Sequence, residues 1–68
     1  MTRITLRAAR VNAGYTQKEA ACLLSVSNKT LSLWEQGAAY PKADKIAKIC
    51  ALYGVSYDNL IFLPHTSL

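Results

Sequence analysis

The segment from Thr16 to Gly37 constrains the fold more than any other part of this 68-residue chain. Thr16, with Glu19 three positions later, forms a capping box, which predicts that a helix starts there. Ser27 is a second capping residue, and Gly37 is a typical helix stop, so another short helix is expected between them. The turn that joins the two helices is short enough to hold them at a steep angle.

Caps and breakers divide the rest of the chain in the same way. Gly14 and Gly54 follow apolar stretches, Pro41 precedes one, and Pro64 ends regular structure. No strand-like alternation of apolar and polar residues is evident. The expected helices cover residues 4–12, 16–24, 28–36, 42–53 and 57–61. We therefore predict a compact, five-helix all-α domain over residues 1–61, followed by a tail over residues 62–68.

Charge favours an anionic partner, because eight basic and four acidic residues give a net charge of +4. DNA, RNA and acidic lipid all fit this balance, as does ordinary surface charge. Cys22, Cys50 and the single histidine, His65, lack the number and spacing of a metal site, so no metal or other cofactor is expected. With neither a secretory signal nor a membrane span in view, a cytoplasmic protein with reduced thiols is expected.

The helix expected over residues 28–36 divides into two arcs on a helical wheel. Leu31 and Trp34 lie on the arc that would be buried. The opposite arc is mostly polar and free of acidic groups, and it carries Asn28, Lys29, Ser32, Leu33 and Gln36. Such side chains can bind base edges in a DNA major groove, whereas an ordinary solvated face is the simpler alternative. An exposed leucine is a poor choice for a face that meets only water, and this favours the groove.

A set of residues at fixed spacing between Leu6 and Ile61 supports this interpretation. Its members are Leu6, Arg10, Gly14, Thr16, Gln17, Glu19, Ala21, Leu24, Val26, Ser27, Thr30, Leu31, Ser32, Trp34, Glu35, Gly37, Pro41, Ile46, Ile49, Tyr53, Gly54, Val55, Ser56 and Leu60. In these positions the chain resembles the Cro/CI-type (XRE-like) helix-turn-helix family of phage and bacterial repressors. The resemblance implies a lambda-repressor-like fold and binding to double-stranded DNA, with the helix over 28–36 in the major groove.

The resemblance also implies a role for individual residues. The base-reading positions correspond to Asn28, Lys29, Ser32 and Leu33. The positions that contact the DNA backbone correspond to Gln17, Ser27, Thr30, Gln36 and Lys42. Arg10 and Glu35 correspond to a structural ion pair. Because the base-reading set holds one cation and one leucine, DNA shape is expected to supply part of the specificity.

Other basic residues are ambiguous from the sequence. Lys45 and Lys48 are most simply read as a solvated helix face. Arg3, Arg7 and Arg10 form a stripe at helical spacing, from which Arg3 and Arg7 could either reach phosphates or face water.

Several apolar residues have no obvious place in the core, namely Ile4, Val11, Leu23, Phe62 and Leu63. They indicate either a tail folded back on the domain or a surface for a dimer or a protein partner. We expect a small prophage or mobile-element repressor, phage-encoded or bacterial, that binds DNA as a homodimer. The alternative is an antitoxin that binds a toxin as well as its own promoter. Catalysis is not expected, because the four acids and His65 form no nucleophile–base pair.

Overall fold

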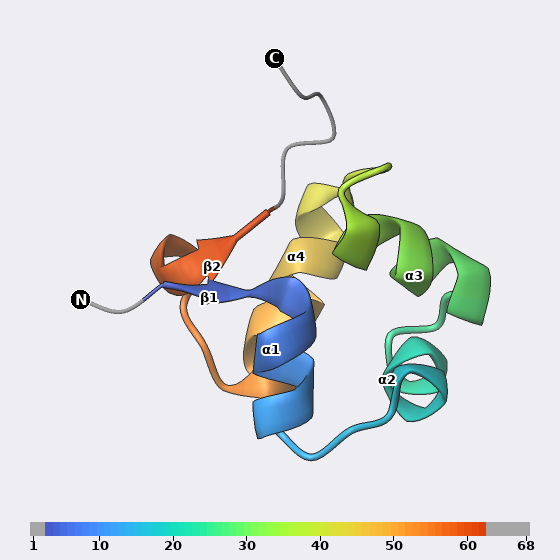
Figure 1. Cartoon of the computed structure of the whole chain (residues 1–68), viewed down its shortest axis with the longest axis horizontal. Helices are drawn as coiled ribbons and strands as arrows, with labels where there is room; N and C mark the ends of the chain where they lie inside the picture. The colour runs from blue at the N-terminus through green and yellow to red at the C-terminus, as the bar shows by residue number, and fades with distance from the viewer. Residues whose placement is uncertain (1–2, 63–68) are drawn as a thin grey trace.

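The computed structural model describes residues 3–62 and shows four α-helices and one pair of very short strands (Figure 1). The helices are α1 (Leu6–Asn12), α2 (Gln17–Leu23), α3 (Asn28–Gln36) and α4 (Ala43–Tyr53). The strands are β1 (Ile4–Thr5) and β2 (Leu60–Ile61), and a 3₁₀ turn, Tyr57–Asn59, precedes β2. The prediction of a mainly helical domain is confirmed, but the count of five helices is wrong.

The first and last predicted helices are the ones that the structure corrects. Residues 57–61 form a 3₁₀ turn and a strand instead of a helix, and Ile4 pairs with Leu60 in a parallel ladder. Helix α1 begins only at Leu6, because the Thr5 side chain caps it by accepting from the Ala8 amide. Strands of two residues are too short to show the alternation by which strands are recognised, so this pair could not be predicted from the sequence pattern.

All four helices are followed by a residue with positive φ. Three of these residues are glycines, Gly14 at 90°, Gly37 at 81° and Gly54 at 71°. The fourth, at the end of α2, is Ser25 at 60°. The left-handed conformation reverses the chain direction at a helix end, and glycine adopts it without the steric cost that serine bears.

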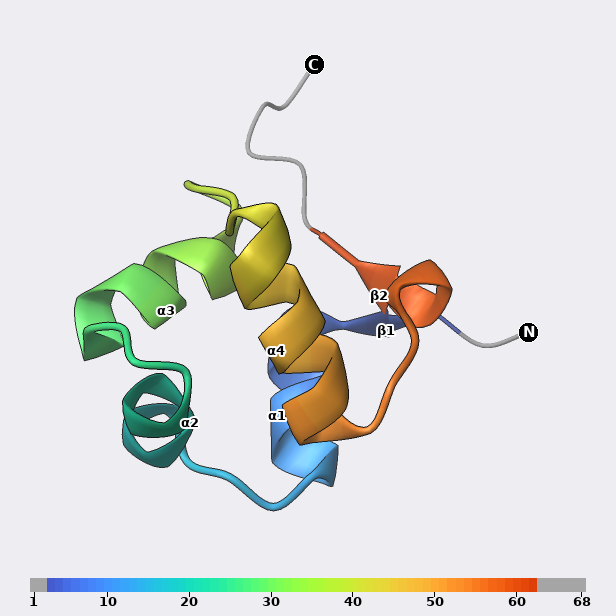
Figure 2. The ribbon, with the colours of Figure 1, turned by 180° about the vertical axis from the view of Figure 1, so that it is seen from behind.

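Every helix contributes to a single core. Leu24 of the α2 cap, Leu31 of α3 and Ile49 of α4 are its most deeply buried large side chains. Seen from behind, α4 lies in front of α1, while α2 and α3 flank them on one side and the strands lie on the other (Figure 2). This core orients α3 with one side against the domain and the other outward.

Candidate nucleic-acid interface

Helix α3 divides as its sequence pattern predicts. Leu31, Trp34 and Glu35 are buried, whereas Asn28, Lys29 and Gln36 are exposed. Ser32 and Leu33 are only half-buried, so they lie at the margin of the outer arc. Ser27 caps the helix by accepting from the Thr30 amide at 3.0 Å. An outward polar arc on a helix whose other side is anchored in a core is the geometry that a groove-binding helix needs.

A chain of polar side chains connects the interior to this arc. Arg10 Nε of α1 lies 2.7 Å from Glu35 Oε2 of α3, and both side chains are buried. Gln17 Nε2 of α2 donates to the other carboxylate oxygen of Glu35 at 3.1 Å. Gln17 Oε1 in turn accepts from Asn28 Nδ2 at 3.0 Å.

This chain of contacts holds three helices in register. Arg10 also donates from Nη1 to the Tyr15 carbonyl at 2.9 Å, so one guanidinium ties α1 to both α3 and the start of α2. The structure contains the Arg10–Glu35 ion pair that the family resemblance implied. Because the carboxylate is neutralised by its partner and buried, it does not oppose an approaching anion. Gln17 uses both ends of its amide within the protein, as an orienting bridge to Asn28.

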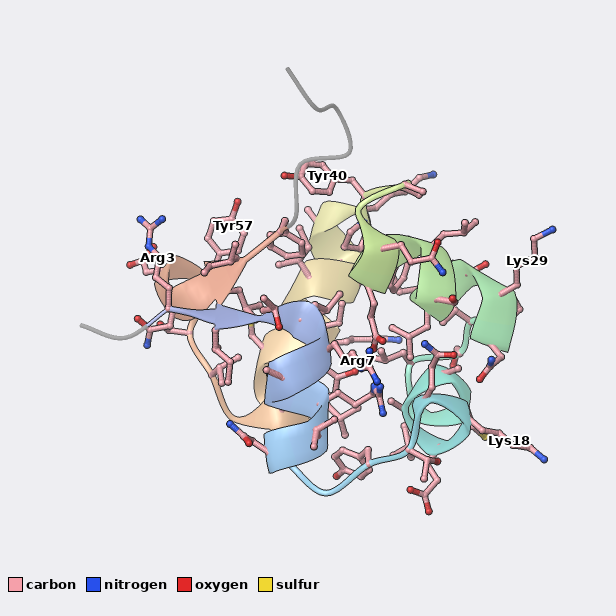
Figure 3. The ribbon with its side chains drawn as sticks, viewed as in Figure 1. Arg3, Arg7, Lys18, Lys29, Tyr40 and Tyr57 are labelled. Carbon is pink, nitrogen blue, oxygen red and sulfur yellow. The ribbon has the colours of Figure 1, made fainter. Side chains whose placement is uncertain are left out.

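An open hollow of about 550 Å³ lies beside this network. Its polar lining comprises Arg7, Arg10, Thr16, Gln17, Ser32, Glu35 and Gln36. On the α3 side of the hollow, Gln36 Nε2 donates to Ser32 Oγ at 2.9 Å. Since Glu35 pairs with Arg10, Arg7 carries the remaining charge of the lining. Arg7 lines this hollow, and Figure 3 shows its side chain reaching from α1 toward α2.

The other predicted DNA-contacting residues are distributed around α3. Thr30 Oγ1 accepts from the Ser27 hydroxyl at 2.9 Å, so both hydroxyls serve the helix cap. Lys29 projects into solvent at the amino-terminal end of α3 (Figure 3). Lys42 is exposed at the position before α4. Arg3 lies before β1, far from Arg7 in Figure 3, so the stripe of three arginines does not continue along one helix.

Sequence reasoning missed one residue in the turn between α2 and α3 and one residue of α4 that contacts this turn. Ser25 adopts the left-handed conformation that is usually left to glycine. Lys45 of α4, expected to face water, is half-buried, and its Nζ donates to the Leu24 carbonyl at 2.8 Å. This contact could not be predicted from the local sequence, because Lys45 is 21 residues from Leu24 in the chain. The position of Lys45 in the helical pattern fits a solvent-exposed face equally well.

The apolar residues without a predicted place fall into separate groups. Val11 and Leu23 are each 56% exposed. Ile4 packs against the core from β1, and Phe62 does so while contacting Tyr40 and Tyr57, with ring centroids 5.3 and 6.0 Å apart. Leu63 lies outside the described residues. Apart from Val11, the exposed large apolar side chains of residues 3–62 thus lie either around Leu23 or among the rings of Tyr40, Tyr57 and Phe62.

Residues 3–62 contain neither a candidate metal site nor a candidate membrane-spanning helix. No group of three or more His, Cys, Asp or Glu side chains is placed to hold a metal ion. None of the helices in that range is long and apolar enough to cross a membrane.

A short turn between α2 and α3, with α3 anchored in the core on one side and polar on the other, is the arrangement of a helix-turn-helix domain. A family model described as a helix-turn-helix domain matches residues 3–61. The chain is also 46% identical over 56 residues to the HTH-type transcriptional regulator ImmR of Bacillus subtilis (strain 168). The aligned part covers 82% of this chain and 44% of ImmR, so the chain spans less than half of that relative. The chain belongs to the Cro/CI-type helix-turn-helix family, which is not a family of enzymes.

Proposed function

We propose that this protein is a sequence-specific regulator of transcription that inserts α3 into the major groove of double-stranded DNA. The observation that carries the proposal is the chain from Arg10 through Glu35 and Gln17 to Asn28, with successive contacts of 2.7, 3.1 and 3.0 Å. It fixes the amino-terminal end of α3 relative to α2 and leaves the polar arc outward. The relative ImmR, a transcriptional regulator by name, supports the same function.

In this proposal, Asn28, Lys29, Ser32 and Leu33 contact the base edges. The second proton of the Asn28 amide and its oxygen are available to an adenine, because one Nδ2 proton suffices for Gln17. Lys29 donates to guanine, and the half-buried Leu33 contacts a thymine methyl group. Because two of these side chains are short and one is apolar, sequence-dependent DNA shape contributes to the choice of site.

Phosphates of the DNA backbone occupy the hollow beside Arg7 and Gln36 and lie along Lys42. The residues proposed for this backbone contact are Gln17, Ser27, Thr30, Gln36 and Lys42. Arg7, which lines the same hollow, is proposed with them. A guanidinium that lines a polar hollow suits a phosphate, since it can donate two parallel hydrogen bonds. The net charge of +4 favours the same partner.

The test begins with selection of bound sequences from a random DNA pool, which supplies the binding site. Lys29→Ala is expected to lower affinity for that site by about 5- to 150-fold, because one base contact is worth about 1–3 kcal/mol. Lys18→Ala is the matched control, since Lys18 is exposed on α2 and points away from the hollow (Figure 3). An equal loss with Lys29→Ala on random duplex would contradict a base-reading role.

We further propose that the protein is a small prophage or mobile-element repressor that acts as a dimer on two half-sites. A single domain makes few phosphate contacts, and two recognition helices about 34 Å apart reach successive turns of one DNA face. The rings of Tyr40 and Tyr57, 70% and 59% exposed, form with Phe62 an apolar surface that could join two copies. Sedimentation on a palindromic site should show two chains per duplex, and one chain per duplex would refute the dimer.

The alternative function, an antitoxin that also binds its promoter, draws support from the surface around Leu23. Two open apolar hollows, of about 440 and 340 Å³, share that residue. Successive residues of a helix are 100° apart on a helical wheel, which places Leu23 and Gln17 on different faces of α2. A protein can therefore bind at Leu23 while α3 contacts DNA. Co-purification with a second small protein, lost in Leu23→Lys, would favour this function.

A further inference from the structure

The turn between α2 and α3 contains a helix end of a defined type. The Val26 amide donates to the Ala21 carbonyl at 3.0 Å, and the Ser25 amide donates to the Cys22 carbonyl at 3.1 Å. This pair of bonds is the Schellman arrangement, in which the residue corresponding to Ser25 is left-handed. Glycine occupies that position after the other three helices.

One carbonyl at this helix end is bound from outside the turn. The Leu24 carbonyl accepts from Lys45 Nζ at 2.8 Å, and Lys45 belongs to α4. The ammonium group lies where the carbonyls of α2 give the helix end a partial negative charge, which strengthens the contact. This hydrogen bond thus links the turn to α4, a helix that does not belong to the polar arc of α3.

The position of this contact matters because only Leu24, Ser25 and Val26 separate α2 from the Ser27 cap of α3. A change in the backbone of these residues therefore changes the angle of α3 relative to α2. Specific DNA binding requires the phosphate-binding and base-reading helices to fit one duplex together, whereas non-specific binding requires mainly positive charge.

We propose that Lys45 is a positioning residue for DNA recognition, which sets the orientation of α3 through its hydrogen bond to the Leu24 carbonyl. The proposal rests on the DNA-binding function proposed above. Lys45 acts through the backbone of the turn and needs no contact with DNA. Its loss consequently lowers specific affinity while leaving non-specific affinity nearly unchanged.

The experiment compares Lys45→Met with Lys48→Met on the selected site and on random duplex. Both variants remove one positive charge from α4 and keep an unbranched side chain, but Lys48 is exposed. Lys45→Met is expected to lower the ratio of specific to non-specific affinity about tenfold, as for loss of one hydrogen bond to a charged group. Lys48→Met is expected to leave the ratio unchanged, and Lys45→Arg, which can donate to the same carbonyl, is expected to restore most of it.

Amide exchange separates this role from a general loss of stability. In Lys45→Met the Ser25 and Val26 amides are expected to exchange faster, while the Ile49 amide in the core of α4 keeps its protection. Equal ratios in the two methionine variants, or equal exchange at the turn, would overturn the proposal. If the wild-type protein itself does not discriminate between the selected site and random duplex, the DNA-binding function fails first and this inference falls with it.

Discussion

The two turns that flank α2 solve the same problem with different means. The turn before α2 uses Gly14 as its left-handed residue, and its Tyr15 carbonyl accepts from Arg10 at 2.9 Å. The turn after α2 uses Ser25, and its Leu24 carbonyl accepts from Lys45 at 2.8 Å. The first cation is buried and paired with a carboxylate, whereas the second is half-buried.

The two turns receive their stability from different parts of the chain. Gly14 allows the first turn at little steric cost, and the Thr16–Glu19 capping box completes it locally. The left-handed conformation of Ser25 has a steric cost that no neighbouring residue in the sequence offsets. The second turn therefore depends more on the hydrogen bond from Lys45 of α4. A change in α4 is therefore expected to alter the turn that orients α3 more than the turn before α2.

The largest expected effect comes from the buried cation of the first turn. Arg10→Met leaves Glu35 buried without its charge partner, and we expect the free energy of unfolding to fall by about 3–5 kcal/mol. Lys45→Met should lower it by only about 1 kcal/mol, because its hydrogen bond is partly exposed. Denaturant unfolding measures both.

A double variant, Arg10→Met with Glu35→Met, sharpens this result. Removing both charges should recover much of the loss, since an apolar pair needs no compensation. Equal losses for Arg10→Met and Lys45→Met would show that the two turns do not differ in the way described.

An exchange of residues between the turns tests the backbone part of the comparison. Gly14→Ser should lower the free energy of unfolding by about 1–2 kcal/mol, and Ser25→Gly should raise it by about 0.5–1 kcal/mol. At Gly14 an added Cβ would meet no heavy atom within 4 Å, so the cost there is conformational. Thermal unfolding of the two variants gives both signs. A loss of stability in Ser25→Gly would mean that the serine side chain contributes a contact that outweighs its backbone cost.

A smaller effect is expected at high pH, beside the first turn. The Tyr53 ring lies 6.3 Å from that of Tyr15, and its buried hydroxyl has no hydrogen-bond partner among the described residues. Burial, and then the charge of Glu35, raises the pKa of Tyr53 to about 12. Because the unfolded chain ionises this tyrosine first, near pH 10, the stability that it contributes is complete below that pH and declines above it.

The measurement is denaturant unfolding between about pH 9 and about pH 11. Tyr53→Phe should flatten the decline, whereas Tyr57→Phe, which alters an exposed ring, should leave it unchanged. An identical decline in all three proteins would assign it to other groups.

The sequence predicted what is encoded locally. Helices α2 and α3 could be bounded because the Thr16 capping box, Ser27 and Gly37 are local signals. The Arg10–Glu35 pair came from the family resemblance, and the structure supplied its extension through Gln17 to Asn28. Lys45 could not be found, since its acceptor is a backbone carbonyl that any sequence provides. The 57–61 helix was wrong because pairing with distant Ile4 and Thr5 outweighed a weak local helix signal.

The parallel pair of β1 and β2 has a consequence for how the chain folds. Ile4 and Leu60 are neighbours in space but lie near opposite ends of the sequence, so their pairing closes nearly the whole chain into one loop. The entropy lost on closing so long a loop is recovered by only a few backbone bonds and the burial of Leu60. Contacts between neighbouring helices have no such cost. The helices should therefore associate early, and the two strands should join last, as a late and reversible step of folding.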